Sequence, residues 1–145
     1  MDKALNYLSL ARKGGMAELG EEPVGAITRS GKGYLVIVAS DASDHTWRRA
    51  KSFVAGTDQQ CVRVPFTKEE LGGAVGRTAC AMMAVTDIGF AESIAKKLAA
   101  VDPEKYTETA RQLSVKAQRA AQRRAEQRSH EKNVRQGGKK RTAGK

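Results

Sequence analysis

Along the first hundred positions, apolar residues occur either at helical spacing or in short, mostly apolar runs. The opening segment repeats them every three or four positions, which predicts a helix capped by Asp2 and ended by Gly14-Gly15. Its apolar face comprises Ala4, Leu5, Leu8 and Ala11. A second, short helix is expected from Glu21-Glu22-Pro23, because acidic residues and proline favour a first helical turn. The apolar side of this helix would carry Val24, Ala26 and Ile27.

Three runs of mostly apolar residues predict strands over 34–39, 60–64 and 80–85. The first is continuous, which is typical of a central strand buried on both faces. A helix is expected over about 45–54. A shorter one begins with a capping box from Thr67 to Glu70 and ends at Gly72-Gly73, and another follows Asp87. Because helices alternate with buried strands, we predict an α/β fold, a three-layer α/β/α sandwich.

Charge is distributed unequally along the chain. Residues 1–100 contain 13 Lys or Arg and 11 Asp or Glu, a net charge of +2, whereas residues 101–145 contain 13 and 5, a net charge of +8. We therefore predict a body over 1–101 and a basic extension, helical or disordered, over 102–145. Basic segments bind polyanions because each phosphate contact releases condensed counterions. Nucleic acid is the expected partner, with a membrane surface as the competing polyanion.

The extension is rich in helix-forming residues and poor in bulky apolar ones. Asp102-Pro103-Glu104 is typical of a helix start. Basic residues then recur at helical spacing, and four of them are candidate phosphate contacts: Arg119, Arg123, Arg124 and Arg128. Nonspecific affinity for polyanions is the simpler interpretation of such an appendage.

Several other classes of function find little support. No apolar run approaches the roughly 18 residues of a membrane-spanning helix, and the N-terminus lacks the apolar core of a signal peptide. We therefore expect a cytoplasmic protein without membrane contact. Cys61 and Cys80 lack metal-type spacing and are interpreted as small buried hydrophobes, while Asp41 and Asp44 suit helix capping. With two isolated histidines, the sequence predicts no catalytic residue, metal site or cofactor.

Two loops offer better chemistry for nucleic acid. Gly20-Glu21-Glu22 places a glycine turn at a helix N-terminus, whose backbone N–H groups can meet phosphate or base edges. The two acids oppose phosphate, which favours base edges or ribose 2′-hydroxyls. Arg77-Thr78-Ala79 stands just before the third strand, where small residues would let a base approach, although an ordinary turn is the alternative. Aromatic residues are few and scattered, so shape recognition of folded RNA fits better than tracking of single strands.

The order of several motifs points to a known family. They are LARKGG at 10–15, ASDAS at 39–43, FTKEELG at 66–72, and AVTD at 84–87 followed by GFA at 89–91. Over about residues 4–98 the chain resembles the ribosomal L-seven-Ae/L-thirty-e superfamily, in particular its small bacterial members of the kink-turn-binding type. The basic extension lies outside this resemblance.

The resemblance implies a three-layer sandwich that grips RNA with the start of its second helix and the loop before its last strand. Carried onto this chain, those positions are Gly20, Glu21, Glu22 and Pro23, then Arg77, Thr78 and Ala79. Lys13, in the LARKGG motif, is a further RNA-binding candidate. The glycine matches the family, but members usually place Asn-Glu or Lys-Gln where Glu22-Pro23 stands, and a lysine shortly after. The amides and the lysine that read tandem G·A pairs are therefore missing here.

These observations predict a noncatalytic, ribosome-associated protein that recognises a structured, kink-turn-like RNA element, in ribosomal RNA or another folded RNA. The body would recognise the element and the extension would add phosphate affinity. The departure at Glu22-Pro23 supports an alternative, a protein-interaction adaptor that has lost specific RNA contacts. An enzyme is the least supported class, because it would need a cluster of titratable residues.

Overall fold

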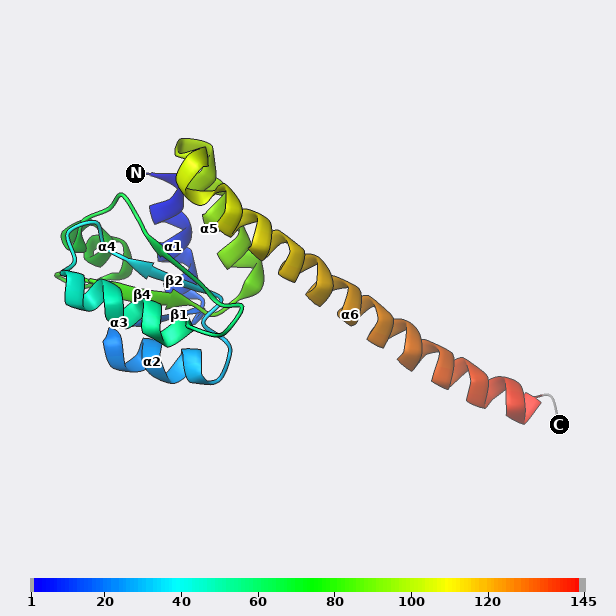
Figure 1. The fold of residues 1–145 in the computed structure, drawn as a ribbon. Helices are drawn as coiled ribbons and strands as arrows, with labels where there is room; N and C mark the ends of the chain where they lie inside the picture. The colour runs from blue at the N-terminus through cyan, green and yellow to red at the C-terminus, as the bar shows by residue number, and fades with distance from the viewer. Residues whose placement is uncertain (1, 144–145) are drawn as a thin grey trace.

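One mixed four-stranded sheet sets the layers of the molecule (Figure 1). The computed structural model describes residues 2–143, with side chains up to residue 131. The strands are β1 (Ala17–Leu19), β2 (Leu35–Val38), β3 (Gln60–Arg63) and β4 (Met82–Val85), in the spatial order β1-β4-β2-β3. β3 is parallel to β2, whereas β4 runs antiparallel to both of its neighbours. The two inner strands, β2 and β4, are buried at every position, as expected for the apolar run at 34–39.

Helices cover both faces of this sheet (Figure 1). On one side α1 (Lys3–Lys13) packs against α4 (Lys68–Val75) and α5 (Ile88–Val101). On the other side α2 (Glu21–Arg29) packs against α3 (Asp44–Val54). The predicted α/β/α sandwich is therefore confirmed. The extension forms one long helix, α6 (Pro103–Ala143), which leaves the body (Figure 1).

Capping side chains fix where several helices begin. Asp2 caps α1, Ser43 caps α3 and Asp87 caps α5, each through a side-chain oxygen that accepts a backbone N–H. Thr67 and Glu70 form the reciprocal capping box at the start of α4. These local bonds satisfy N–H groups that a first helical turn leaves unpaired.

The predicted end of α4 is wrong. The helix continues through Gly72-Gly73 to Val75 and ends at Gly76, whose φ of 77° is the left-handed conformation favoured at a helix C-terminus. Leu71 and Val75 are both buried in the core, so their burial offsets the cost of the two helical glycines.

The predicted apolar side of α2 is also partly wrong. Ala26 is exposed, and the buried positions are Val24, Gly25 and Thr28. Residues four apart share a helix face, and Thr28 can be buried because its hydroxyl donates to Val24 O at 2.9 Å.

The core of the body extends into the first turns of α6. Tyr106, Ala110 and Leu113 are buried at helical spacing. The Tyr106 hydroxyl donates to Arg63 O at 2.8 Å. Burial, helped by the Asp102 carboxylate, raises the pKa of Tyr106 to about 12, so the hydroxyl keeps its proton at neutral pH. Three turns of the predicted extension therefore complete the core.

Candidate nucleic-acid interface

One end of the sheet brings together the two loops predicted to contact RNA. Gly20 N donates to Met82 O at 2.9 Å, and Ala39 N donates to Ala81 O at 3.0 Å. These bonds extend the antiparallel ladders of β4 with β1 and β2. The N-terminus of α2 therefore lies beside the loop 76–81, which leads into β4.

The start of α2 leaves backbone donors for a ligand. Gly20 is the N-cap, with a φ of 93° that favours glycine, and it supplies no side-chain cap. Pro23 has no N–H to satisfy. Within the described part of the chain, the N–H groups of Glu21 and Glu22 have no hydrogen-bond partner. Two donors at the positive end of a helix dipole are thus available beside the loop 76–81.

The two glutamates at this site differ in their surroundings. Glu21 forms an ion pair with Arg49 of α3, and the Arg49 guanidinium lies 5.4 Å from the centroid of the Phe53 ring. Glu22 is exposed and forms no ion pair among the described residues. Arg49 therefore offsets one of the two charges, and the Glu22 carboxylate remains as an acceptor. It can accept hydrogen bonds from amino groups of base edges, but it repels phosphate.

Sequence reasoning did not identify Arg49 as part of this site. The residue lies far from Glu21 in the sequence, and only the packing of α2 against α3 brings the two side chains together. No motif around Arg49 signals that pairing.

The second loop is held tightly against α4. Arg77 N donates to Gly72 O at 2.8 Å. A β-carbon at Gly72 would lie 2.7 Å from the backbone N and Cα of Ala79 and 2.8 Å from Arg77 O, closer than real β-carbons approach. Glycine at position 72 therefore permits the loop to sit where it does. The side chains of Arg77, Thr78 and Ala79 are exposed.

The remaining predicted RNA-binding residues lie elsewhere. Lys13 is exposed at the end of α1, which leads into the start of β1, so the length of β1 separates it from Gly20. Four basic residues of α6 are exposed beyond the opposite end of the sheet: Arg119, Arg123, Arg124 and Arg128. The structure therefore unites the two loops and leaves Lys13 and the α6 arginines apart from them.

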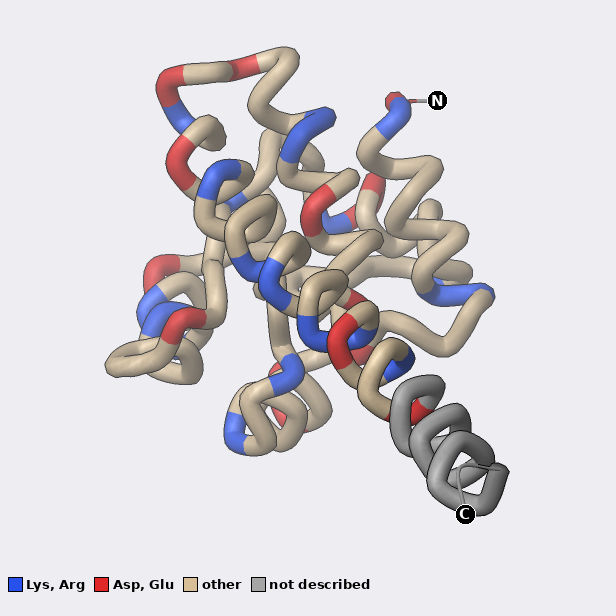
Figure 2. The backbone as a smooth tube through the Cα atoms, turned by 90° about the vertical axis from the view of Figure 1, so that its right-hand side faces the viewer, with Lys and Arg blue, Asp and Glu red and all other residues tan. Residues whose placement is uncertain are grey.

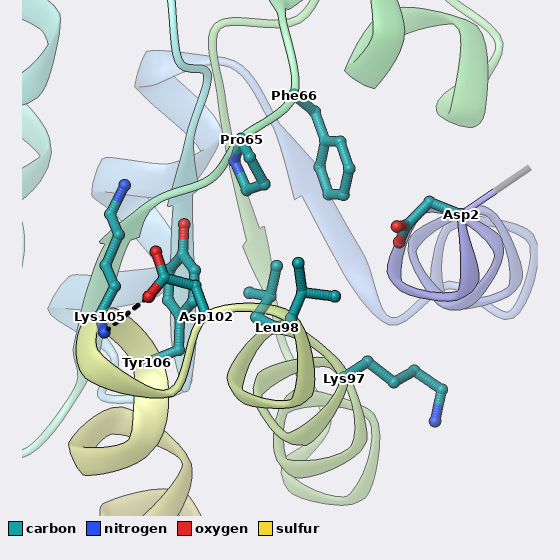
Figure 3. Close-up of a pocket in the computed structure, with 9 residues that line it drawn as sticks. Asp2, Pro65, Phe66, Lys97, Leu98, Asp102, Lys105 and Tyr106 are labelled. Carbon is teal, nitrogen blue, oxygen red and sulfur yellow. Dashed lines mark hydrogen bonds between the residues drawn. The ribbon is translucent and has the colours of Figure 1, made fainter.

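A separate cavity of about 250 Å³ lies between α5, the start of α6 and the segment after β3 (Figure 3). Phe66 and Leu98 contribute apolar surface to it. Its two carboxylates serve helix starts: Asp2 accepts from Ala4 N at 2.7 Å, and Asp102 accepts from Lys105 N at 3.4 Å. The lining contains neither histidine nor cysteine, and its ionisable side chains are two aspartates, two lysines and one tyrosine.

The two cysteines are free thiols in unreactive surroundings. Burial raises the pKa of Cys61 to about 12 and also raises the pKa of Cys80. Since the thiolate is the reactive form, both are poor nucleophiles. Cys80 is buried and Cys61 is half-buried, in line with the interpretation as small hydrophobes.

Among the residues with described positions, no group of three or more His, Cys, Asp or Glu could hold a metal ion. Over the same part of the chain, no helix is both long and apolar enough to cross a membrane.

Comparison with known proteins gives one sequence relative and several similar folds. No family model matches the chain. RNA-binding protein YlxQ of Enterococcus faecium is 31% identical over 90 residues, which cover 62% of this chain and 85% of that protein. A protein of unknown function from Bacillus halodurans has a TM-score of 0.64 and 28% identity, covering 68% of this chain and 98% of its own. The Giardia lamblia 15.5kD RNA binding protein, with a TM-score of 0.51 and 19% identity, covers 68% and 84% and shows the fold alone.

Proposed function

Because this chain belongs to the L-seven-Ae/L-thirty-e superfamily of RNA-binding proteins, we propose that it binds a structured, kink-turn-like RNA element in association with the ribosome. Membership confirms the resemblance carried by the sequence motifs. The family binds RNA and is not a family of enzymes, which agrees with the prediction of a noncatalytic chain. We propose that the protein binds this RNA in the cytoplasm.

The observation that carries the proposal is the meeting of two loops at one end of the sheet. The hydrogen bond from Gly20 N to Met82 O joins the start of α2 to the start of β4. Two helix N-terminal donors and the exposed Glu22 then lie beside the loop that carries the exposed Arg77. A folded RNA presents donors, acceptors and phosphates close together, and this surface can meet all three.

The chemistry of the site favours base edges over bare backbone. The Glu22 carboxylate can accept from the amino group of a guanine, and the N–H groups of Glu21 and Glu22 can donate to base or ribose oxygens. Arg77 can pair with a phosphate or a guanine edge. Since Glu22 carries a charge that phosphate repels, RNAs that splay a base toward this loop are expected to bind best.

Exchange of these side chains tests the loop site. Glu22→Gln and Arg77→Ala should each change the order of affinity across a panel of ribosomal RNA fragments and a kink-turn hairpin, measured by filter binding. Lys96→Ala is the matched control, because Lys96 is an exposed cation on α5 that pairs with Glu92 and belongs to neither loop. If both loop variants bind the whole panel as the wild type does, the loop site is misassigned.

Ribonuclease treatment separates the proposal from the adaptor alternative. Under the proposal, RNA co-purifies with the full chain, and associated ribosomal proteins are lost on ribonuclease treatment. A partner protein that survives this treatment, with no enriched RNA, would favour the adaptor.

A further inference from the structure

We propose that α6 holds a second stretch of RNA, a duplex contacted through its phosphates, at the end of the molecule opposite the loop site, so that one chain joins two RNA segments. The inference rests on the proposed function for its first segment. It adds a second, separate contact surface with a different kind of recognition.

Two contacts of α6 with the body show the direction in which the helix runs. Near its start, the Tyr106 hydroxyl bonds to Arg63 O at the last residue of β3. Ten residues later, Lys116 Nζ donates to Asp58 Oδ1 at 2.9 Å, just before β3 begins. The helix therefore runs back along β3 and passes the end of the sheet where β2 and β3 start. The loop site lies at the other end, where β2 finishes and β4 starts.

The charge of α6 changes where the helix leaves the body. Residues 101–113, which dock on the core, contain two Lys or Arg and three Asp or Glu, a net charge of −1. Residues 114–145 contain eleven and two, a net charge of +9. The basic character of the extension therefore belongs entirely to the part beyond the docked turns. Figure 2 shows Lys and Arg recurring along α6 on its way out of the body.

The start of α6 is fixed to the body on two sides. Leu113 is buried in the core, and the Lys116 ammonium lies 4.9 Å from the centroid of the Tyr34 ring as well as against Asp58. At about 1.5 Å per residue, Arg128 lies about 18 Å beyond Lys116 along the helix axis. Arg119 lies only about 5 Å beyond Lys116 on the same count. The sheet adds roughly 10 Å more to the loop site, so the four arginines lie about 15 to 28 Å from it, or roughly two to three Debye lengths of about 8 Å. The two surfaces are therefore spatially separate, and salt screens most of the interaction between them.

The side chains of α6 indicate what kind of RNA it contacts. Arg119 and Arg123 share one helix face, and Arg124 and Arg128 share the next. All four are exposed, and none forms an ion pair among the described side chains. No Phe, Tyr or Trp follows Tyr106, so this segment has no aromatic platform for unstacked bases. Guanidinium groups without stacking partners suit the phosphates of a duplex, read without regard to sequence.

Salt dependence tests the phosphate contacts. The full chain with Arg119, Arg123, Arg124 and Arg128 all changed to Gln is compared with the wild type on a short RNA duplex of arbitrary sequence. In a plot of log affinity against log salt concentration, the slope of the variant should be shallower than that of the wild type by about 3 to 4, at about 0.9 per lost phosphate contact. Arg111→Gln is the control, because Arg111 lies in the docked turns and pairs with Glu108 at 2.6 Å. An unchanged slope in the fourfold variant would overturn the proposal.

Directed cleavage tests whether two segments are joined. An iron–EDTA group is attached to Gly73→Cys, on α4 beside the loop site, or to Ser129→Cys on α6, and each protein is bound to purified ribosomal RNA. Cys61 and Cys80 should react little because burial raises the pKa of both thiols. Cuts at two separate regions of the RNA would support the inference, whereas coincident cuts, or cuts from Gly73 alone, would overturn it. Cuts from Ser129 alone would overturn the loop site, and with it the joining of two segments, while the α6 contact itself would stand.

Discussion

Replacing Gly72 by alanine is the sharpest single test of how the candidate interface is built. The new β-carbon would lie 2.7 Å from the N and Cα of Ala79 and 2.8 Å from Arg77 O. All of these are backbone atoms, so no side chain can rotate away and the loop itself must shift. We expect Gly72→Ala to displace Arg77 and weaken binding of a kink-turn hairpin without removing any polar group.

The free-energy cost of the steric overlap at position 72 can be isolated by comparison with a neighbouring glycine, Gly73. Gly73 is exposed, and a β-carbon there meets nothing within 4 Å. Gly73→Ala should therefore stabilise the protein by about 0.5–1 kcal/mol through helix propensity alone. Gly72→Ala gains the same term but adds overpacking of about 1–3 kcal/mol. The difference between the two variants is the cost of the overlap, and each kcal/mol corresponds to about 2–4 °C in Tm.

Urea unfolding of both variants measures that difference, and filter binding of the hairpin measures the effect on RNA. The expected outcome is a less stable, weaker-binding Gly72→Ala beside a Gly73→Ala variant that is slightly more stable and binds normally. Two variants with the same unfolding midpoint and the same affinity would refute the role assigned to Gly72.

Three further changes test what holds the fold together. Tyr106→Phe should lower the free energy of unfolding by about 0.5–1.5 kcal/mol, because Arg63 O loses its donor; an unchanged urea midpoint would contradict this. Thr67→Ala should cost about 1 kcal/mol through the capping box, whereas Thr67→Ser, which keeps the hydroxyl, should cost much less in the same assay. The hydrogen bond from Lys116 lowers the pKa of Asp58, so this pair stabilises the fold above the ordinary value of 3.8 and loses its effect as pH falls through the lowered pKa. Asp58→Asn should remove this acid-dependent contribution to the free energy of unfolding. The contribution is at most about 1 kcal/mol, because the Asp58 carboxylate is exposed. Identical acid unfolding curves for the variant and the wild type would contradict a stabilising role of the pair.

The elements that could be predicted from sequence depend on local signals. The capping box at Thr67 and Glu70 and the continuous apolar run at 34–39 each specify their structure within a few residues. Both were confirmed. The end of α4 was missed because Gly72-Gly73 is a typical helix stop, whereas burial of Val75 against the core decides the outcome.

The parts of the site that escaped prediction depend on tertiary contacts. Nothing near Arg49 in the sequence indicates that it neutralises Glu21, and Gly72 acquires its role only where the backbone of Ala79 approaches it. The docking of the first turns of α6 is indicated by Tyr106, Ala110 and Leu113, which recur at helical spacing. It was not predicted, because the residues around these three are mostly polar.

The contact of Tyr106 with β3 also bears on self-association. β3 is the outer strand beside β2, and Val64 N donates inward to Val38 O, so the neighbouring carbonyl of Arg63 points outward. An uncovered strand rim of this kind is a template onto which another chain can add. Because α6 runs along this edge and the Tyr106 hydroxyl binds the outward carbonyl of Arg63, the helix protects the edge strand from pairing with another chain. A shortened protein that stops before Tyr106 would lose this protection together with part of its core, so truncations meant to remove only the basic charge should stop after Lys116.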